Sequence, residues 1–421
     1  MIHLLTKVLS AEHHLGSMTS LCVICPRASQ REEVYDLFQA IRTKATLLET
    51  LKIESFTSTA GNSTLAVTIL EGEFEFLRKL ELSWTIHISP ECLTCLVGME
   101  YLQEMSLCFR RDIGLDFLVN GCSTAKNHTR PALKRTFPVL RSLKVMAHSL
   151  DQCTALVSLV TSPFLDTITF SYDVQAPSTL IEAFFHQVQK TCQDAVTGST
   201  SAVLSPPHTI SLTLKHNLGP FSSAAPPFLI HPSQTFAPLL ALRHLRTLRL
   251  LHLGTIAIDD GFLREAAIAW GAHIQELEEC GIPWVGVEES SDLPEFVAAT
   301  LDGVGEFMRR CPRLERLRLA FDGRGPTPQE SPDEHQGMQN KEQASDMHTD
   351  RPSQESGQTA HLSSALQVLN VRDSPIDNPE GVARFLKRVA PALRVICVEG
   401  SLDMWRKWRE VEDLMKLAGT Y

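Results

Sequence analysis

The feature that most constrains the fold of this chain is a short apolar pattern, Leu-x-x-Leu-x-Leu, whose clearest copy runs from Leu314 to Leu319. Side chains alternate along a β-strand, so Leu317 and Leu319 point to one face while Arg316 and Arg318 point to the other. One such strand cannot bury its apolar face alone and needs further copies stacked beside it. The number of copies therefore decides what the chain can form.

The pattern occurs twelve times, with other apolar residues replacing leucine at several places. The copies are Met18/Leu21/Val23, Leu48/Leu51/Ile53, Leu77/Leu80/Leu82, Leu102/Met105/Leu107, Leu140/Leu143/Val145, Leu165/Ile168/Phe170, Thr209/Leu212/Leu214, Leu245/Leu248/Leu250, Ile274/Leu277/Glu279, Leu314/Leu317/Leu319, Leu366/Leu369/Val371 and Leu393/Ile396/Val398. Most copies lie 25 to 44 residues apart, which is wider than the ~20–29 residues of standard leucine-rich repeats. The series predicts an α/β fold, a degenerate leucine-rich-repeat solenoid with a curved, mostly parallel sheet on the concave side and helices on the convex side. Glu279 takes an apolar place, so we expect one distorted repeat.

Apolar residues at helical spacing lie between the predicted strands, as a strand-plus-helix repeat requires. This spacing predicts helices over 34–41, 181–188, 259–270, 301–308 and 378–389. We expect residues 1–17 to form an N-terminal segment and residues 18–400 to form the solenoid. Residues 401–421 are expected to form a capping helix over the last repeat, with one apolar stripe made by Trp405, Trp408, Val411 and Met415.

One long segment interrupts the repeats. Residues 323–361 contain no Leu, Ile, Val or aromatic residue and are rich in Gln, Glu, Asp, Ser and Pro. Such a composition cannot offset the entropy of ordering by burial, so we expect a disordered insertion inside the repeat array. The insertion is either a tolerated loop or, through its Ser-Pro and Thr-Pro pairs, a site of phosphorylation.

Charge and cysteine content restrict the compartment and the partners. The net charge is −10 and the pI is about 5.9, which argues against nucleic acid as a partner because phosphate binding needs a basic face. No apolar run approaches the ~20 residues of a membrane span, so we expect no membrane association, and the first residues lack a signal peptide. The odd number of cysteines, 11, favours a reducing compartment, either cytoplasmic or nuclear.

The common catalytic motifs are absent from the sequence. It contains no G-x-S-x-G, no phosphate-binding G-x-x-x-x-G-K-[ST] and no H-E-x-x-H. Two Cys-x-x-Cys pairs, Cys22/Cys25 and Cys92/Cys95, have zinc-ligand spacing but lie far apart and are better explained as structural cysteines. We therefore expect no enzyme, no catalytic residue, no cofactor and no metal. A cysteine- or metal-dependent enzyme is the alternative from another class.

The strand residues that point away from the apolar side form a candidate binding surface. Arginine binds carboxylate or phosphate groups through two parallel hydrogen bonds, so basic residues here suit an acidic or phosphorylated protein segment. The candidate partner-binding residues are Lys144, Arg249, Arg316, Arg318 and Arg372. The alternative is that these charges pair with Glu276, Glu278 and Glu315 and only keep the exposed sheet soluble.

The C-terminal two thirds of the chain resembles F-box proteins with degenerate leucine-rich repeats, a group abundant in mushroom-forming fungi (basidiomycetes). The residues that carry the resemblance are Phe137-Pro138, Asp259-Asp260, Ala269-Trp270, Cys311-Pro312 with Leu314, Leu317 and Leu319, then Leu369 to Ile376, Val382-Ala383, Phe385-Leu386, Pro391 and Trp405. The order of these motifs is more informative than any single one.

The resemblance implies substrate recognition for ubiquitination. In this group the F-box docks the linker subunit of a cullin-RING ubiquitin ligase, and the repeats hold the protein substrate. Residues 1–17 match nothing of the F-box, and repeats that begin at Met18 leave no room for its helices. Either the gene model lacks the F-box or this is a repeat-only relative. The expected function is a non-enzymatic protein-interaction module, an F-box-like ubiquitin ligase adaptor; the alternative is a leucine-rich-repeat scaffold unrelated to ubiquitination.

Overall fold

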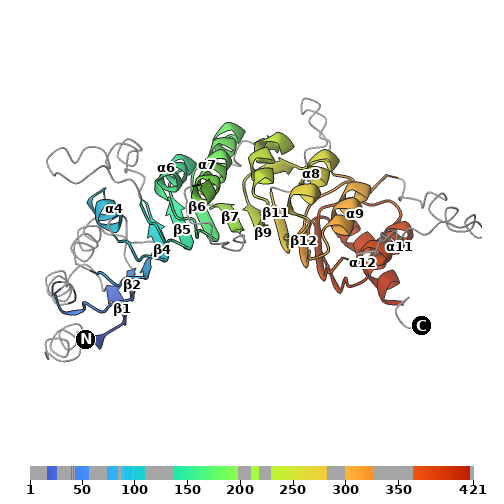
Figure 1. The fold of residues 1–421 in the computed structure, drawn as a ribbon. Helices are drawn as coiled ribbons and strands as arrows, with labels where there is room; N and C mark the ends of the chain where they lie inside the picture. Colours follow the sequence, from blue (N-terminus) through green and yellow to red (C-terminus); the bar gives the residue numbers. More distant parts are fainter. Residues whose placement is uncertain are drawn as a thin grey trace, which may run out of the picture. The chain divides into compact units, whose positions relative to one another are not determined.

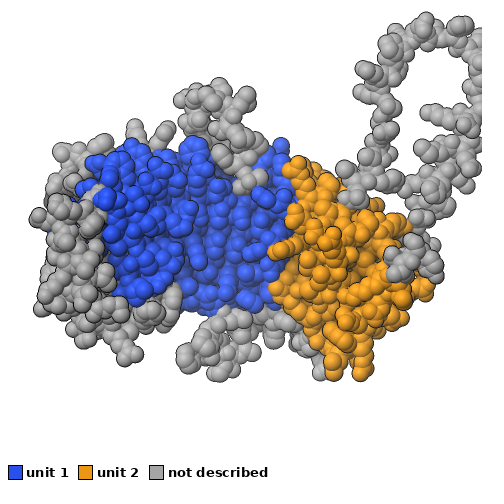
Figure 2. All heavy atoms as spheres, turned by 90° about the horizontal axis from the view of Figure 1, so that it is seen from below, with its two compact units in different colours: residues 1–257, 273–282 blue, residues 258–272, 283–421 orange. Residues whose placement is uncertain are grey.

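The computed structural model describes residues 17–25, 39, 41, 43–55, 74–83, 88, 90–97, 99–109, 136–197, 210–217, 229–281, 299–325 and 364–417. The chain divides into two compact units (Figure 2). Unit 1 comprises residues 1–257 and 273–282, and unit 2 comprises residues 258–272 and 283–421.

The described strands of the main sheet match the repeated pattern one for one. Those of unit 1 are β1 (Ser20–Cys25), β2 (Thr50–Ser55), β3 (Lys79–Leu82), β4 (Glu104–Cys108), β5 (Ser142–Ala147), β6 (Thr167–Tyr172), β7 (Ile210–His216), β9 (Leu245–Leu251) and β11 (Glu276–Cys280). Those of unit 2 are β12 (Arg316–Arg318), β13 (Val368–Arg372) and β14 (Val395–Val398). The sheet has twelve strands in chain order, and every pairing within each unit is parallel. The predicted α/β class and strand series are confirmed.

Helices connect these strands, as parallel pairing requires. Unit 1 contains α4 (Pro90–Val97), α6 (Leu150–Leu159), α7 (Ser178–Thr197) and a 3-10 helix (Ser233–Ala241). Unit 2 contains α8 (Asp260–Trp270), α9 (Leu301–Arg310), α11 (Pro379–Val389) and α12 (Leu402–Leu417). Two short strands that the pattern did not predict, β8 (Ile230–Pro232) and β10 (Thr255–Ala257), pair in parallel and form a separate two-stranded sheet.

Four of the described helices begin after a polar side chain that accepts a hydrogen bond from the backbone N–H three residues later. Asp259, Thr300, Asn378 and Ser401 accept this bond at 2.7, 3.2, 2.9 and 3.3 Å. Each bond satisfies a backbone donor that the first helical turn leaves unpaired. Pro379 then occupies the first turn of α11, where the missing N–H costs nothing. The predicted starts of α8 and α11 are confirmed.

The core lies between the apolar side of the strands and the helices. Ile181, Phe184, Phe185 and Val188 of α7 are all fully buried, as their helical spacing predicts. Phe184 meets Phe170 of β6 edge to face, with ring centroids 5.2 Å apart. The apolar residues of the strands and of the helix stripe therefore bury one another, which explains why strands and helices alternate along the chain.

Three sequence expectations need correction or lie outside the described residues. Glu279 is buried, its carboxylate accepts a hydrogen bond from the N–H of Gly281, and β11 pairs with β9 without a register shift, so the expected distortion is absent. The insertion begins later than residue 323, because Gly323 forms a bridge with Ile376 and the described structure continues to Gly325. The rest of the insertion, and most of the helix predicted over 34–41, lie outside the described residues.

Helix α12 is present as predicted, but its apolar stripe is not. Trp408 and Val411 are fully buried, whereas Trp405 is 48 % exposed. Residues spaced by three drift around a helix by about 60° at each step, since three residues turn it by about 300°. Trp405 therefore lies at the edge of the buried side of the helix, where about half of its side chain is exposed.

Candidate functional site

The strands of unit 1 have one covered face and one open face. In β6, Ile168, Phe170 and Tyr172 are buried, while Thr169 and Ser171 between them are half-exposed. Helices α4, α6 and α7 all lie on the same side of the strands they join (Figure 1). Parallel sheets are usually covered by helices on both faces. A parallel sheet whose second face carries polar, accessible side chains therefore presents a surface that a partner can reach.

We call these accessible polar strand residues of unit 1 the open face. They are Lys52, Glu54, Lys79, Glu81, Glu104, Ser106, Ser142, Lys144, Thr167, Thr169, Ser171, Ser211, Thr213, Lys215, Thr247, Arg249, Glu276 and Glu278. The open face follows the strand order, and its chemistry changes from one end to the other.

Charges at the N-terminal end of the open face are paired across neighbouring strands. The Lys52 amine lies 2.8 Å from the Glu54 carboxylate and 3.1 Å from that of Glu81. Lys79 lies 2.6 Å from Glu104. Hydrogen bonds to these carboxylates raise the pKa of both lysines above the ordinary value. These side chains already satisfy one another, so they offer little net charge to a ligand.

Charges at the other end of the open face are paired as well. The Arg249 guanidinium donates to both carboxylate oxygens of Glu276, at 2.8 and 2.9 Å, and lies 3.5 Å from Glu278. Both hydrogen bonds come from one guanidinium nitrogen, Nη2, so the Glu276 carboxylate lies across that nitrogen. The sequence left open whether Arg249 binds a partner or pairs with Glu276 and Glu278. In the structure it pairs with both glutamates.

Between these ends, strands β5 to β7 carry a patch rich in hydroxyl groups, which we call the hydroxyl face. It consists of Ser142, Lys144, Thr167, Thr169, Ser171, Ser211, Thr213 and Lys215. Lys144 is exposed and Lys215 half-exposed, and neither forms an ion pair with any residue that the structure describes. Lys144 lies in register with Thr169 and Thr213, and Lys215 follows Thr213 by two residues. Strand spacing and rise then put the two lysine Cα atoms about 12 Å apart.

A cavity of about 380 Å³ adjoins Lys144 on the same side of the sheet. Its lining includes Lys52, Glu81, Ser106 and Ser171 as well as the buried Cys108. Burial, with a smaller effect from the charge of Asp173, raises the pKa of the Cys108 thiol to about 12. The thiol is therefore protonated at neutral pH and is a poor nucleophile. Among the described residues, no three or more His, Cys, Asp or Glu side chains are grouped to hold a metal ion.

The remaining predicted arginines belong to unit 2, and two of them, Arg318 and Arg372, lie around one carboxylate, that of Glu399. Arg318 donates to it at 2.7 Å and Asn370 at 2.9 Å, while the Nε of Arg372 lies 3.9 Å away. Burial acts to raise the pKa of Glu399, but the Asn370 hydrogen bond and the charges of Arg318 and Arg372 outweigh it and lower the pKa. The Arg372 side chain is only 3 % exposed. Arg318 and Arg372 thus share an internal counter-charge.

The five predicted residues are not gathered into one site. Lys144 and Arg249 lie on the open face of unit 1, with β6 and β7 between their strands. Arg316, Arg318 and Arg372 lie in unit 2, and of these Arg316 is exposed and forms no ion pair with a described residue. The expected pairing partner Glu315 forms no ion pair within the described structure, where Glu399 takes that role.

Sequence reasoning missed Lys215 and Glu399. Lys215 follows the last apolar residue of the weakest pattern copy, which begins with Thr209, and extending the alternation by one residue identifies it. Glu399 follows the final strand residue, Val398, and its position opposite Arg318 depends on a fold contact 81 residues long. That contact has no local signal in the sequence.

Comparison with known proteins leaves the function to be argued from the structure. Within the part of the chain that the structure describes, no helix is both long and apolar enough to cross a membrane. The sequence matches no protein-family model, and no curated protein matches it. The open face and its hydroxyl-rich centre therefore carry the functional argument.

Proposed function

We propose that this chain is a non-enzymatic protein-interaction module built as a leucine-rich-repeat solenoid, with the open face as its binding surface. The single observation that carries the proposal is the uncovered, polar face of a long parallel sheet. Twelve copies of one pattern, stacked as consecutive parallel strands with helices in the connections, support the solenoid. A surface of this kind binds an extended or folded protein over several strands at once.

The chemistry of the hydroxyl face favours an acidic or phosphorylated protein segment as the ligand. Serine and threonine hydroxyls can donate hydrogen bonds to carboxylate or phosphate oxygens. Lys144 and Lys215 add positive charge, since neither forms an ion pair with a residue that the structure describes. The arginines fit this role less well, because Arg249 is held by Glu276 and Arg318 by Glu399. We therefore place the proposed partner contact on the hydroxyl face and no longer on the arginines.

Substrate recognition for a cullin-RING ubiquitin ligase is the specific form of this proposal that the F-box resemblance suggests. The chain would present its protein substrate on the open face, in the cytoplasm or the nucleus, while the ligase's linker subunit binds elsewhere. A leucine-rich-repeat scaffold unrelated to ubiquitination remains the alternative. Both forms use the same face, so the first experiment tests the face and the second distinguishes the forms.

The test is affinity purification of the tagged full chain from its own cells, with mass spectrometry of the bound proteins. The charge-reversal variant K144E/K215E should lose the main partners, because two cations on the face become anions that repel an acidic segment. The matched control, K190E/R384E, makes the same charge change at exposed residues of α7 and α11 and should keep those partners. Equal recovery with both variants would remove the proposed surface.

The identity of the recovered proteins separates the two forms of the proposal. Recovery of the linker and cullin subunits with the wild-type chain supports the adaptor form. Recovery of other proteins, lost in K144E/K215E and without any ligase subunit, supports the scaffold. In either case, partner binding must be lost in K144E/K215E and kept in the control variant. Circular dichroism and thermal unfolding check that K144E/K215E is still folded.

A further inference from the structure

The cavity beside Lys144 crosses the strands of unit 1, and we call it the strand cavity. It has a volume of about 380 Å³, and residues from β2 to β6 line it. Its lining includes one row of residues in register across four strands, which consists of Lys52, Glu81, Ser106 and Lys144. A ligand in this cavity therefore lies across the strands and meets the side chains of several repeats at once.

The end of the strand cavity at β2 and β3 has an excess of negative charge. The Lys52 amine lies 2.8 Å from the Glu54 carboxylate and 3.1 Å from that of Glu81, so two carboxylates share one amine. The next amine, that of Lys79, lies 2.6 Å from Glu104 and so brings its own carboxylate. Two amines against three carboxylates leave a net charge of −1 among the described open-face residues of β2 to β4.

The opposite end of the strand cavity is positive. Lys144 on β5 is exposed, and its neighbours in register, Ser106 and Thr169, are uncharged. Two strand spacings separate Glu81 from Lys144, which puts their Cα atoms about 10 Å apart. The strand cavity thus has a carboxylate pair at one end and an ammonium group at the other.

The floor of the strand cavity between these charges is apolar. Cys108 is 4 % exposed, and burial is the main reason that the pKa of its thiol is raised to about 12, so the thiol is uncharged at neutral pH. Met146 lies beside it in register on β5 and is half-exposed. Sulfur-containing side chains adapt their packing to apolar groups. Such a floor suits the aliphatic stem of a long basic side chain, whose charged head stays near polar groups.

We propose that the strand cavity binds a lysine or arginine side chain of the partner, two or three residues away from the acidic or phosphorylated residue that contacts Lys144. The stem of the basic side chain lies over Cys108 and Met146, and its head binds the carboxylates of Glu54 and Glu81. Residues on one side of a β-strand or of a polyproline II helix recur every two or three positions, about 7–9 Å apart, which matches the separation of the two ends. The inference rests on the function proposed above and specifies its ligand.

Other side chains fit the negative end of the strand cavity less well. An acidic side chain would add to the negative charge that is already in excess there. An apolar side chain would cover the carboxylates of Glu54 and Glu81 without replacing the water that they bind, which costs free energy. Lys52 does not take the place of the ligand, because one amine cannot neutralise two carboxylates. A basic side chain is the occupant that removes the excess charge.

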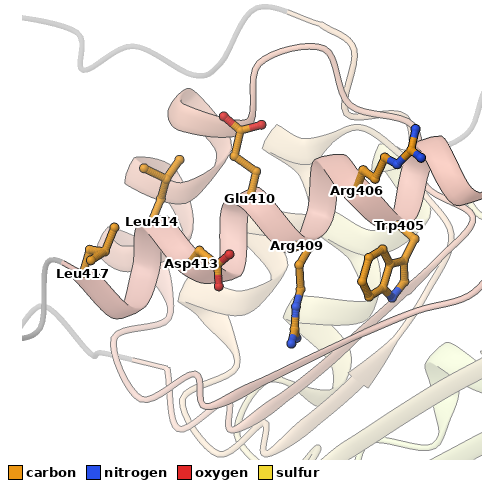
Figure 3. A pocket seen from close by; sticks show the side chains of 7 residues that line it. All are labelled: Trp405, Arg406, Arg409, Glu410, Asp413, Leu414 and Leu417. Atoms are coloured by element: carbon orange, nitrogen blue, oxygen red, sulfur yellow. The ribbon is translucent and has the colours of Figure 1, made fainter.

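The cavity along α12 lacks this organisation (Figure 3). It has a volume of about 420 Å³, and all the residues that line it belong to that one helix. The Arg409 guanidinium lies over the Trp405 ring, 5.7 Å from its centroid, and also pairs with Glu412. Two basic and two acidic side chains line this cavity, so its charge favours no class of ligand. The strand cavity, built by several strands with its charges separated, is the more selective of the two.

The test is selection of peptides by the tagged full chain from a phage-displayed library of random dodecapeptides. The wild type should enrich peptides that carry an acidic and a basic residue two or three positions apart. E54Q/E81Q removes both carboxylates and nearly keeps the side-chain size, so it should enrich acidic residues without the basic one. The matched control, E75Q/E182Q, makes the same change at exposed glutamates of unit 1 outside the open face and should select the same peptides as the wild type.

Titration of one selected peptide then measures the contact itself. Replacing its basic residue with glutamine should raise the Kd for the wild type about fivefold, as expected for an exposed ion pair worth up to ~1 kcal/mol, and should leave the Kd for E54Q/E81Q unchanged. Selected peptides without a basic preference, or the same loss with both proteins, would overturn the inference and leave the proposed function standing. Failure of the proposed function itself differs, because then no peptide is enriched, or the enriched peptides bind K144E/K215E as tightly as the wild type, and the inference falls with it.

Discussion

The replacement of Gly305 by alanine tests how closely helices α9 and α11 approach. Gly305 lies in the middle of α9, and a Cβ added there would stand 2.1 Å from the Cζ of Phe385 and 2.9 Å from its Cε1. Phe385 is itself only 3 % exposed, on α11. Reaching an ordinary contact of about 3.4 Å requires the ring to move by about 1.3 Å, the difference between 3.4 and 2.1 Å.

Two opposite effects set the size of the change. Alanine is better than glycine inside a helix by about 1 kcal/mol. Overpacking a filled core costs about 1–3 kcal/mol, and a displacement above 1 Å falls toward the upper end of that range. We therefore expect G305A to lower the free energy of unfolding by about 1–2 kcal/mol. The melting temperature of a unit of this size falls by about 2–4 °C for each kcal/mol.

The assay is thermal unfolding of G305A beside two further variants. The matched control is G261A in α8, where the nearest atom to the new Cβ is an Asp259 carboxylate oxygen at 3.1 Å; this variant should be neutral or slightly stabilised. F385L removes the ring atoms that collide, so G305A should cost at least 1 kcal/mol less in that background. If G305A raised the melting temperature as G261A does, the close packing of α9 on α11 would be refuted.

Three further changes have expected outcomes that thermal or chemical unfolding measures. The hydroxyl of Tyr172 is buried with no hydrogen-bond partner among the described residues, so Y172F should keep or raise stability, by about 1 kcal/mol; a loss above 1 kcal/mol would contradict this. E399Q removes the counter-charge of the buried Arg372 and should cost about 1 kcal/mol at pH 7, a small value because Glu399 is 41 % exposed and solvent screens it. Folding lowers the pKa of Glu399, so the stability contributed by its charge is complete above about pH 4.5 and is lost as the pH falls through the folded-state pKa. The unfolding free energies of the wild type and E399Q should therefore converge at low pH. A difference that stays constant with pH would argue against a role for the charge. D260A removes two hydrogen bonds from Thr300, at 2.7 and 2.8 Å, and should cost about 1–2 kcal/mol, with D260N intermediate.

The strands were predictable because their signal is local. Alternation with period two is recorded within each copy of the pattern, so Leu143 and Val145 identify β5 without knowledge of any neighbour. The pattern also tolerates exceptions that the fold absorbs. Glu279 occupies an apolar place in β11, yet its carboxylate finds the backbone N–H of Gly281, and the strand keeps its register.

The binding surface was less predictable because pairing is not local. Arg249 has the right residue type and the right face, but Glu276 on the neighbouring strand, 27 residues away, neutralises it. Arg318 is engaged by Glu399 in the same way. Conversely, the sequence already named Lys144 as a candidate, whereas Lys215 is identified only from the strand register, and neither lysine forms an ion pair with a residue that the structure describes. The sequence shows which residues are charged. Whether a charged side chain is paired within the protein depends on which strands are neighbours in the sheet.

The exposed side of α12 shows the same limit in a helix. Helical spacing identified Trp408 and Val411 correctly, but it also placed Trp405 on the buried side. Which part of an apolar arc is buried depends on where α11 and Phe321 meet the helix. The sequence shows which helix residues are apolar, whereas tertiary packing determines which of them are buried.

The most direct test of the central claim is to ask which side of unit 1 a partner touches. A photo-crosslinking residue, p-benzoylphenylalanine, is placed at Thr169 in the centre of the hydroxyl face or at Ala183, an exposed residue of α7 on the helix side. Irradiation of each tagged full chain in its own cells, followed by mass spectrometry, identifies the adducts. We predict protein adducts from position 169 that disappear in the K144E/K215E background, and none of the same proteins from position 183. Adducts from position 183 alone would contradict the assignment of the open face as the binding surface.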